Sequence, residues 1–217
     1  MERTVHSTSS ILPALKLGAI VDFVVSNPGE QTRLVEKLRK AYLDEDARPW
    51  LYYEPWATGL KQAITSLNPA EVLQRVVDSI DDPIKLAHFR ELHNGSLQFL
   101  SKYRPSLVPV RSSTWSDGVN TIAIKPQLGL NLDAGPTPLA VFTYMKKAPL
   151  SQGTANVPLW MIEQACSDIL PSGHAGILDV RRGKLWTLRP NAAPKRLNAS
   201  AAGVVANFMT IWRKIAS

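Results

Sequence analysis

Apolar residues recur with a period close to 3.6 in the first half of the chain, which is typical of amphipathic helices. Three of these runs follow a helix-start signal, in which Asn or Asp stands at the N-cap and Pro comes next. The signals lie at 27–30, 68–71 and 82–83, and the third run continues to Tyr103 with a break expected near Asn94-Gly95. The pattern predicts a helical region over residues 1–104.

The pattern changes at Pro105 to runs typical of strands. Two apolar runs, 121–132 and 139–144, flank Asp133, Ala134, Gly135 and Pro136, which is the signature of a β-hairpin. A strand is expected over 107–112, a helix over 157–170, strands over 175–180 and 184–189, and a last amphipathic helix through 204–215. The sequence therefore predicts an α+β (or α/β) fold, with an N-terminal helical layer followed by a mixed sheet with two flanking helices over 105–217. We expect both regions to form one cooperative unit.

Length and cysteine content narrow the class of protein. A chain of 217 residues can bury a sizeable core without disulfide or metal cross-links. Cys166 is the single cysteine and lies on an apolar helical stripe, which indicates a core residue in a reducing compartment. The apolar segment from Ile11 to Val25 contains Lys16 and Asp22 and is short for a membrane span. We expect a buried helix or strand there, a cytoplasmic protein, and no membrane partner.

The net charge of +7 is confined to the second half of the sequence. Residues 1–104 contain 13 basic and 13 acidic residues, whereas 105–217 contain 12 basic and five acidic ones. This asymmetry favours an acidic partner, either nucleic acid or an acidic protein surface, although a solvated basic face without a partner is an equally simple interpretation.

Residues 119–190 carry a loose motif: Lys125-Pro126-Gln127, an apolar strand ending in Lys146-Lys147, a helix with Glu163 and Gln164, and Asp179. On these residues the segment resembles the PD-(D/E)xK nuclease-like superfamily, including bacterial proteins of similar length. The resemblance implies a nuclease-like core. In active members two carboxylates and a lysine hold a divalent metal that activates water. The candidates here are Asp133, Lys146 and Asp179, with Glu91 as a further acid and Mg²⁺ as the cofactor.

Two departures from that motif favour a scaffold that binds without cleaving. Tyr144 stands two residues before Lys146, where the motif has an acid, and Gln127 replaces the acid after Pro126. The resemblance then implies a degenerate site with no metal and no cofactor. Our leading interpretation is a nucleic-acid-binding protein, and a metal-dependent nuclease is the enzyme alternative.

Basic residues at strand ends and turns are the candidates for phosphate contacts, which neutralise the backbone without reading sequence. Trp186 lies among them and offers a ring on which a base stacks. The candidate nucleic-acid-binding residues are Lys146, Lys147, Arg181, Arg182, Lys184, Trp186, Arg189, Lys195 and Arg196. The aromatic segment Trp50 to Trp56 is a second stacking candidate, or an extended segment packed on the core. A third function, a protein-interaction subunit of a larger assembly, would use this segment and the basic turns.

Overall fold

A computed structural model describes residues 15–44, 46, 49–133 and 135–216. It confirms the predicted α+β fold. Five strands form the main sheet in the order β2-β5-β6-β7-β8, and a three-stranded sheet has the order β1-β4-β3. In the main sheet β6 and β7 are parallel and the other neighbours are antiparallel. The strands are β1 Leu15–Lys16, β2 Ser106–Val108, β3 Ser113–Ser116, β4 Thr121–Ile124, β5 Leu128–Leu132, β6 Gly135–Tyr144, β7 His174–Asp179 and β8 Lys184–Trp186.

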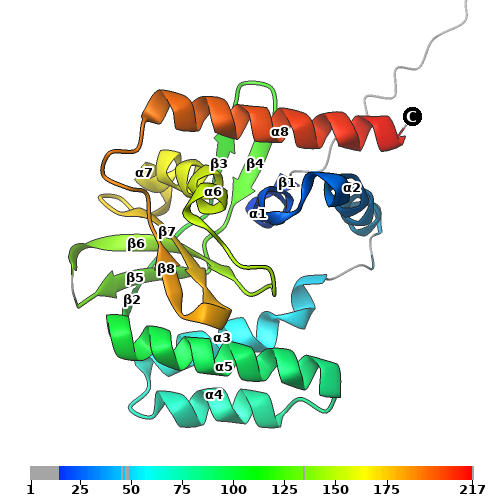
Figure 1. Cartoon of the computed structure of the whole chain (residues 1–217). Helices are drawn as coiled ribbons and strands as arrows, with labels where there is room; N and C mark the ends of the chain where they lie inside the picture. The colour runs from blue at the N-terminus through cyan, green and yellow to red at the C-terminus, as the bar shows by residue number, and fades with distance from the viewer. Residues whose placement is uncertain (1–14, 45, 47–48, 134, 217) are drawn as a thin grey trace, which may run out of the picture.

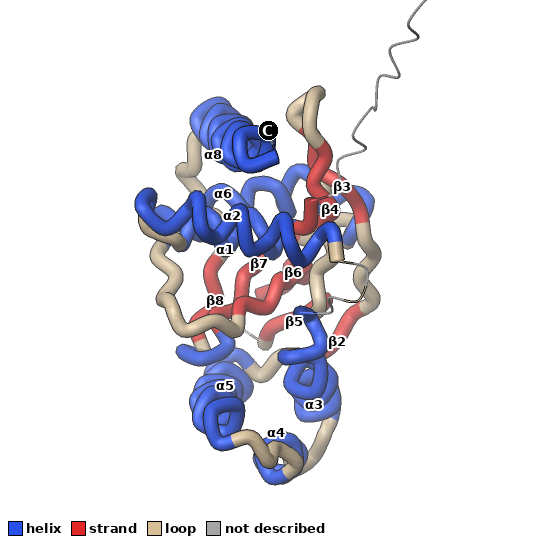
Figure 2. Tube along the Cα trace, turned by 90° about the vertical axis from the view of Figure 1, so that its right-hand side faces the viewer, coloured by secondary structure: helices blue, strands red, loops and turns tan. Residues whose placement is uncertain are grey.

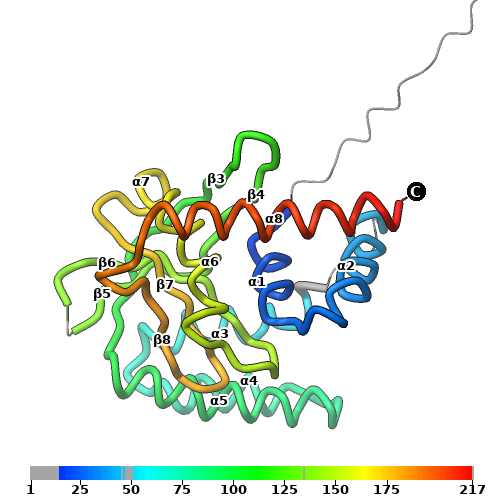
Figure 3. Tube along the Cα trace, turned by 45° about the horizontal axis from the view of Figure 1, so that its top comes forward, coloured from blue at the N-terminus to red at the C-terminus, as the bar shows by residue number. Residues whose placement is uncertain are grey.

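Helices cover both faces of the main sheet (Figures 1 and 2). One face carries α3, α4 and α5, and the other carries α1, α2, α6, α7 and α8. Figure 3 shows α8 crossing above α1 and α6 and ending beside α2. The α-helices are α1 Leu17–Val25, α2 Pro28–Leu43, α3 Glu54–Thr65, α4 Pro69–Asp78, α5 Pro83–Tyr103, α6 Gln152–Gln164, α7 Cys166–Ile169 and α8 Pro194–Ala216, and the short 3₁₀ helices are η1 Pro49–Tyr52 and η2 Val180–Arg182.

The N-terminal helices do not form the single layer that the sequence predicts. The apolar sides of α1 and α2 join one hydrophobic core with α6 and α8. Those of α3, α4 and α5 join a second core on the other face of the sheet. Periodicity identifies a buried stripe but not the surface that it packs against, so the split is not readable from the helical pattern. Among the described residues, no helix is both long and apolar enough to cross a bilayer.

The predicted hairpin forms, but with a later first strand. Its strands are β5 and β6, and the run expected to begin at Thr121 is divided between two sheets, because β4 pairs with β3 and β1 instead. The division falls at Pro126, whose ring leaves the backbone without an N–H to continue a ladder. Pro126 therefore lets the chain pass from one sheet to the other.

Other boundaries also differ from the sequence prediction: the strand expected over 107–112 ends at Val108, and the last helix, expected through 204–215, begins at Pro194. The helix expected from residue 157 begins at Gln152, because Ser151 and Thr154 form a reciprocal capping box. The strand expected over 184–189 ends at Trp186. Helix α3 was not predicted at all, and the aromatic segment that we expected to be extended forms η1 and the start of α3.

Helix α5 runs without a break through Asn94-Gly95 because this glycine is a packing contact. A Cβ atom on Gly95 would lie 2.0 Å from the Val180 carbonyl oxygen and 2.4 Å from the Arg181 carbonyl carbon. On the other side of the contact, Gly183 has a φ of 56° and faces the Gly95 carbonyl oxygen. Backbone therefore meets backbone where α5 crosses the turn after β7.

We predict that Gly95→Ala destabilises the fold by about 3 kcal/mol or more, because overpacking against rigid backbone cannot be relieved by a side-chain rotation. The matched control is Gly203→Ala in α8, where a Cβ meets nothing within 4 Å. The free energy of unfolding of the control should increase by about 0.5–1 kcal/mol, because Ala has a higher helix propensity than Gly. Urea denaturation of the three proteins measures both effects, and equal stabilities of Gly95→Ala and wild type would contradict the packing account.

Candidate functional site

The candidate site lies where the parallel strands β6 and β7 both end. Tyr144, the last residue of β6, is the register partner of Asp179, the last residue of β7. Lys146 and Lys147 follow β6, η2 follows β7, and Lys184 begins the antiparallel strand β8 at the same end. Topology thus brings together five cations that are distant in sequence, and we call this the basic end of the sheet: Lys146, Lys147, Arg181, Arg182 and Lys184.

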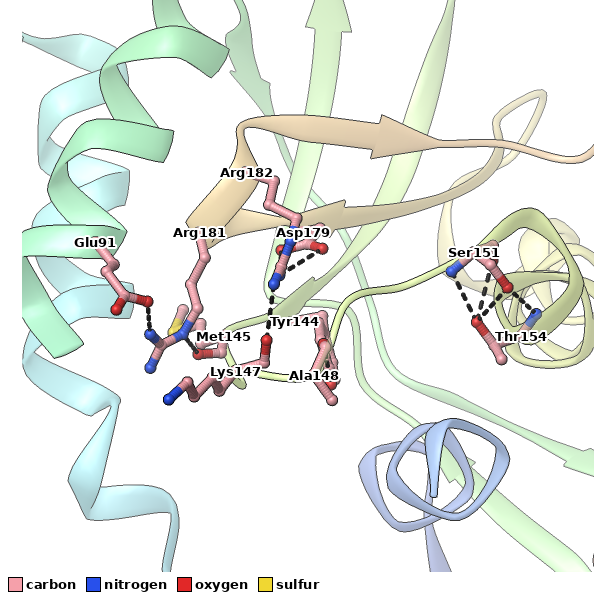
Figure 4. A network of polar contacts seen from close by, with 10 residues as sticks. All are labelled: Glu91, Tyr144, Met145, Lys147, Ala148, Ser151, Thr154, Asp179, Arg181 and Arg182. Atoms are coloured by element: carbon pink, nitrogen blue, oxygen red, sulfur yellow. Dashed lines mark hydrogen bonds and ion pairs between the residues drawn. The ribbon is translucent and has the colours of Figure 1, made fainter. Parts of the chain in front are cut away.

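Two arginines of the basic end hold the structure together (Figure 4). The Arg181 side chain is only 3% exposed; it donates from Nε to the Met145 carbonyl oxygen at 2.8 Å and forms an ion pair with Glu91 of α5. Arg182 donates from Nη2 to the Lys147 carbonyl oxygen at 2.7 Å and from Nη1 to Asp179. These contacts tie the end of β6 to η2 and α5. Arg181, predicted as a phosphate contact, is instead a buried structural residue.

Asp179 is the acid of this network. Its side chain is 1% exposed and lies 3.1 Å from the Arg182 guanidinium. Burial raises the pKa of the Asp179 carboxyl, although Arg182 and backbone donors oppose the shift. Both of its oxygens are bound by Arg182, so this carboxylate is occupied in holding η2.

Lys146 forms an ion pair across the fold with Asp22 of α1. The Asp22 side chain is 12% exposed and the Lys146 side chain 50% exposed. Burial raises the pKa of Asp22, because the loss of water around the carboxylate outweighs the attraction of Lys146 and Lys37. The pair therefore links a buried acid to a cation at the solvent boundary.

Beside this pair lies a cleft of about 630 Å³. The start of α1 forms one side, the start of α3 another, and the end of β6 the floor, with Lys125 and Gln127 between β4 and β5. Phe142 and Tyr53 present partly exposed rings to it, and Lys16, Lys125 and Lys146 stand among its lining residues with Asp22 and Glu54. Most of the lining is thus apolar, with charged groups from four segments of the chain.

The three predicted catalytic residues do not converge. Asp133 lies in the turn before β6, 3.9 Å from Arg104, whereas Lys146 follows the other end of that strand. β6 has ten residues, which at about 3.3 Å per residue separates its ends by about 30 Å. Only Lys146 and Asp179 share an end of the sheet, and the proposed trio with Asp133 is therefore wrong as a metal site. Among the residues that the structure describes, no three His, Cys, Asp or Glu side chains are grouped as metal ligands.

The predicted nucleic-acid-binding residues fall into two groups rather than one edge. Five form the basic end, whereas β8 leads away from it, so Arg189, Lys195 and Arg196 lie beyond the opposite end of β8, toward the start of α8 (Figure 1). Trp186 is half-buried, and the Lys184 ammonium lies 3.7 Å from the centre of its ring. That face of Trp186 is covered, which is at odds with the predicted base stacking.

The other predicted segments are mainly structural. The Gln127 side-chain oxygen accepts the Thr143 backbone N–H at 2.8 Å and so extends the β5–β6 pairing beside Lys146. Trp56 is fully buried and donates to Ser96. Tyr52 packs against Phe89 and hydrogen-bonds His88. Arg48 and the side chain of Trp50 are outside the parts of the chain that the structure describes.

Asp22 is a site residue that the sequence pattern does not single out as functional. The sequence does contain a hint, because Asp22 is a lone acid within an apolar helical segment. A buried charge requires a partner. The partner, Lys146, is 124 residues away. The local pattern could not identify it.

Comparisons with family models, curated proteins and solved structures found no match.

We predict that the Asp22 carboxyl makes the folded state less stable as pH rises. A carboxyl whose pKa is raised in the folded state contributes its full stabilisation below the unfolded value, near 3.8, and loses it as pH rises through the folded-state pKa. Asp22→Asn lacks this titration. Denaturation of both proteins from acidic to neutral pH should therefore show the wild type losing stability relative to the variant. If the stability of the wild type instead rises relative to that of the variant as pH increases, the attraction of Lys146 outweighs the effect of burial on the Asp22 pKa.

Proposed function

We propose that the protein binds nucleic acid through the basic end of the sheet, by contacts to phosphates. The observation that carries the proposal is the presence there of two exposed lysines, Lys147 and Lys184, which have no carboxylate partner among the described residues. Five cations at this end face three carboxylates, Asp22, Glu91 and Asp179, each of which is already paired. The surplus positive charge is thus at the solvent boundary.

The neighbouring cleft favours nucleic acid over an acidic protein surface as the partner. Single-stranded nucleic acid is held by cations that follow the backbone together with aromatic rings that take bases. Lys147 and Lys184 supply the first element, and Phe142 and Tyr53, which are partly exposed and line the cleft together with Lys146, supply the second.

We predict salt-sensitive binding of a fluorescently labelled single strand of about 16 nucleotides. Affinity measured by anisotropy should fall steeply between about 50 and 200 mM salt, because phosphate contacts release counterions. The double variant Lys147→Gln with Lys184→Gln should weaken binding and reduce the slope of log affinity against log salt by about 1.4, or about 0.7 for each lost contact to a single strand.

The matched control removes two cations from the other group. Lys195→Gln with Arg196→Gln changes net charge equally but lies at the start of α8, so it should leave the slope unchanged. Equal losses of affinity in both double variants would reject the basic end as the binding surface. No binding of the strand at the lowest salt concentration would reject nucleic-acid binding as the function. The length of the strand is followed in parallel samples with Mg²⁺ and with EDTA. Cleavage that depends on the metal would favour the nuclease alternative over binding without cleavage.

A further inference from the structure

The cleft beside the basic end joins two features that a nucleotide requires. Its apolar part includes the partly exposed rings of Phe142 and Tyr53, and its charged part includes Lys125 and Lys146. Its volume of about 630 Å³ is within the range of about 300–1,000 Å³ that is usual for small-ligand pockets. The chemistry and the size both suit one base with its phosphate.

Gly18 leaves the Phe142 ring open to the cleft. It is the second residue of α1 and lines the cleft, and a Cβ built on it would lie 3.6 Å from the tip of the ring, at ordinary contact distance. A small side chain would therefore be accommodated, whereas a large one would extend over the ring. The glycine keeps an aromatic surface available without strain in its own backbone.

Asp22 is already paired with Lys146, the cation that a phosphate would approach. Its carboxylate is bound to Lys146, and both residues line this cleft and a smaller one on the other side of the pair. The Lys146 side chain is half exposed while Asp22 is largely buried. A phosphate arriving from solvent can thus reach the ammonium group and compete with the carboxylate for it.

We infer that this cleft binds one nucleotide of a single strand, with the base against Phe142 and the phosphate on Lys146 in place of Asp22. This inference rests on the proposed binding of nucleic acid and adds to it a site for one unstacked base. Asp22 is then an internal competitor that weakens binding, and Lys146 is the residue that contacts the ligand.

The test is calorimetric titration with a dinucleoside monophosphate, whose single phosphodiester keeps its charge across the working pH range. The same compound with a neutral methylphosphonate linkage is the charge control. Wild-type protein should bind the phosphodiester at least about tenfold more tightly than the neutral analogue, which is the scale of a hydrogen bond to a charged group. Equal affinity for the two would overturn the role of Lys146.

Two variants of the ion pair separate competition from structural support. Asp22→Asn should tighten binding by up to about fivefold, the release of one partly exposed ion pair, while Lys146→Met should weaken it. If the pair served only to hold α1 on β6, both substitutions would shift affinity in the same direction, and that outcome would contradict the inference. Thermal unfolding of each variant confirms that the compared proteins are folded.

Gly18→Leu should fill the cleft and abolish dinucleotide binding. Gly29→Leu is its matched control, because Gly29 is also the second residue of its helix and a Cβ there meets nothing within 4 Å. Unchanged binding by Gly18→Leu would place the nucleotide elsewhere. If wild type binds the longer strand but not the dinucleotide, the inference fails while the proposed function stands, and if it binds neither, both fail.

Discussion

The close contact between α5 and the turn after β7 is the constraint on which the arrangement of the basic end depends. Gly95 lets the helix backbone meet Val180 and Arg181 directly. Arg181 is thereby buried, and it reaches back to the Met145 carbonyl oxygen and out to Glu91. A buried guanidinium is tolerated only when its charge and its donors are satisfied. The contact thus fixes the end of β6 against η2, and with it the backbone of Lys146 and Lys147.

Charge counted along the sequence misjudges the charge that is presented to solvent. The second half has a large positive excess, but acids from the first half neutralise part of it across the fold. Asp22 pairs with Lys146, and Glu91 pairs with Arg181. What remains exposed depends on which cations lack such partners. Lys147 and Lys184, which have no carboxylate partner among the described residues, were therefore not distinguishable in the sequence from Arg181, which is structural.

Local signals predicted the elements well and their assembly poorly. Asp82 caps α5 by accepting backbone N–H groups of Ile84 and Lys85, as its position before Pro83 indicates, and the turn at Asp133 joins β5 to β6. Asp133 and Lys146 lie at opposite ends of β6, and their separation follows from the length of this strand, which the pattern underestimated by beginning it at Leu139. Helix α3 was missed because its sequence begins with aromatics and Pro55, which resemble an extended segment. The pairing of Asp22 with Lys146 required the tertiary fold.

The most direct test of the account is an NMR titration of isotope-labelled protein with a short single-stranded oligonucleotide. We expect the largest amide shifts in the segment 142–147, in η2 and at the start of α1, because these meet at the basic end and its cleft. Shifts concentrated instead between Arg189 and Arg196, with the end of β6 unaffected, would contradict it.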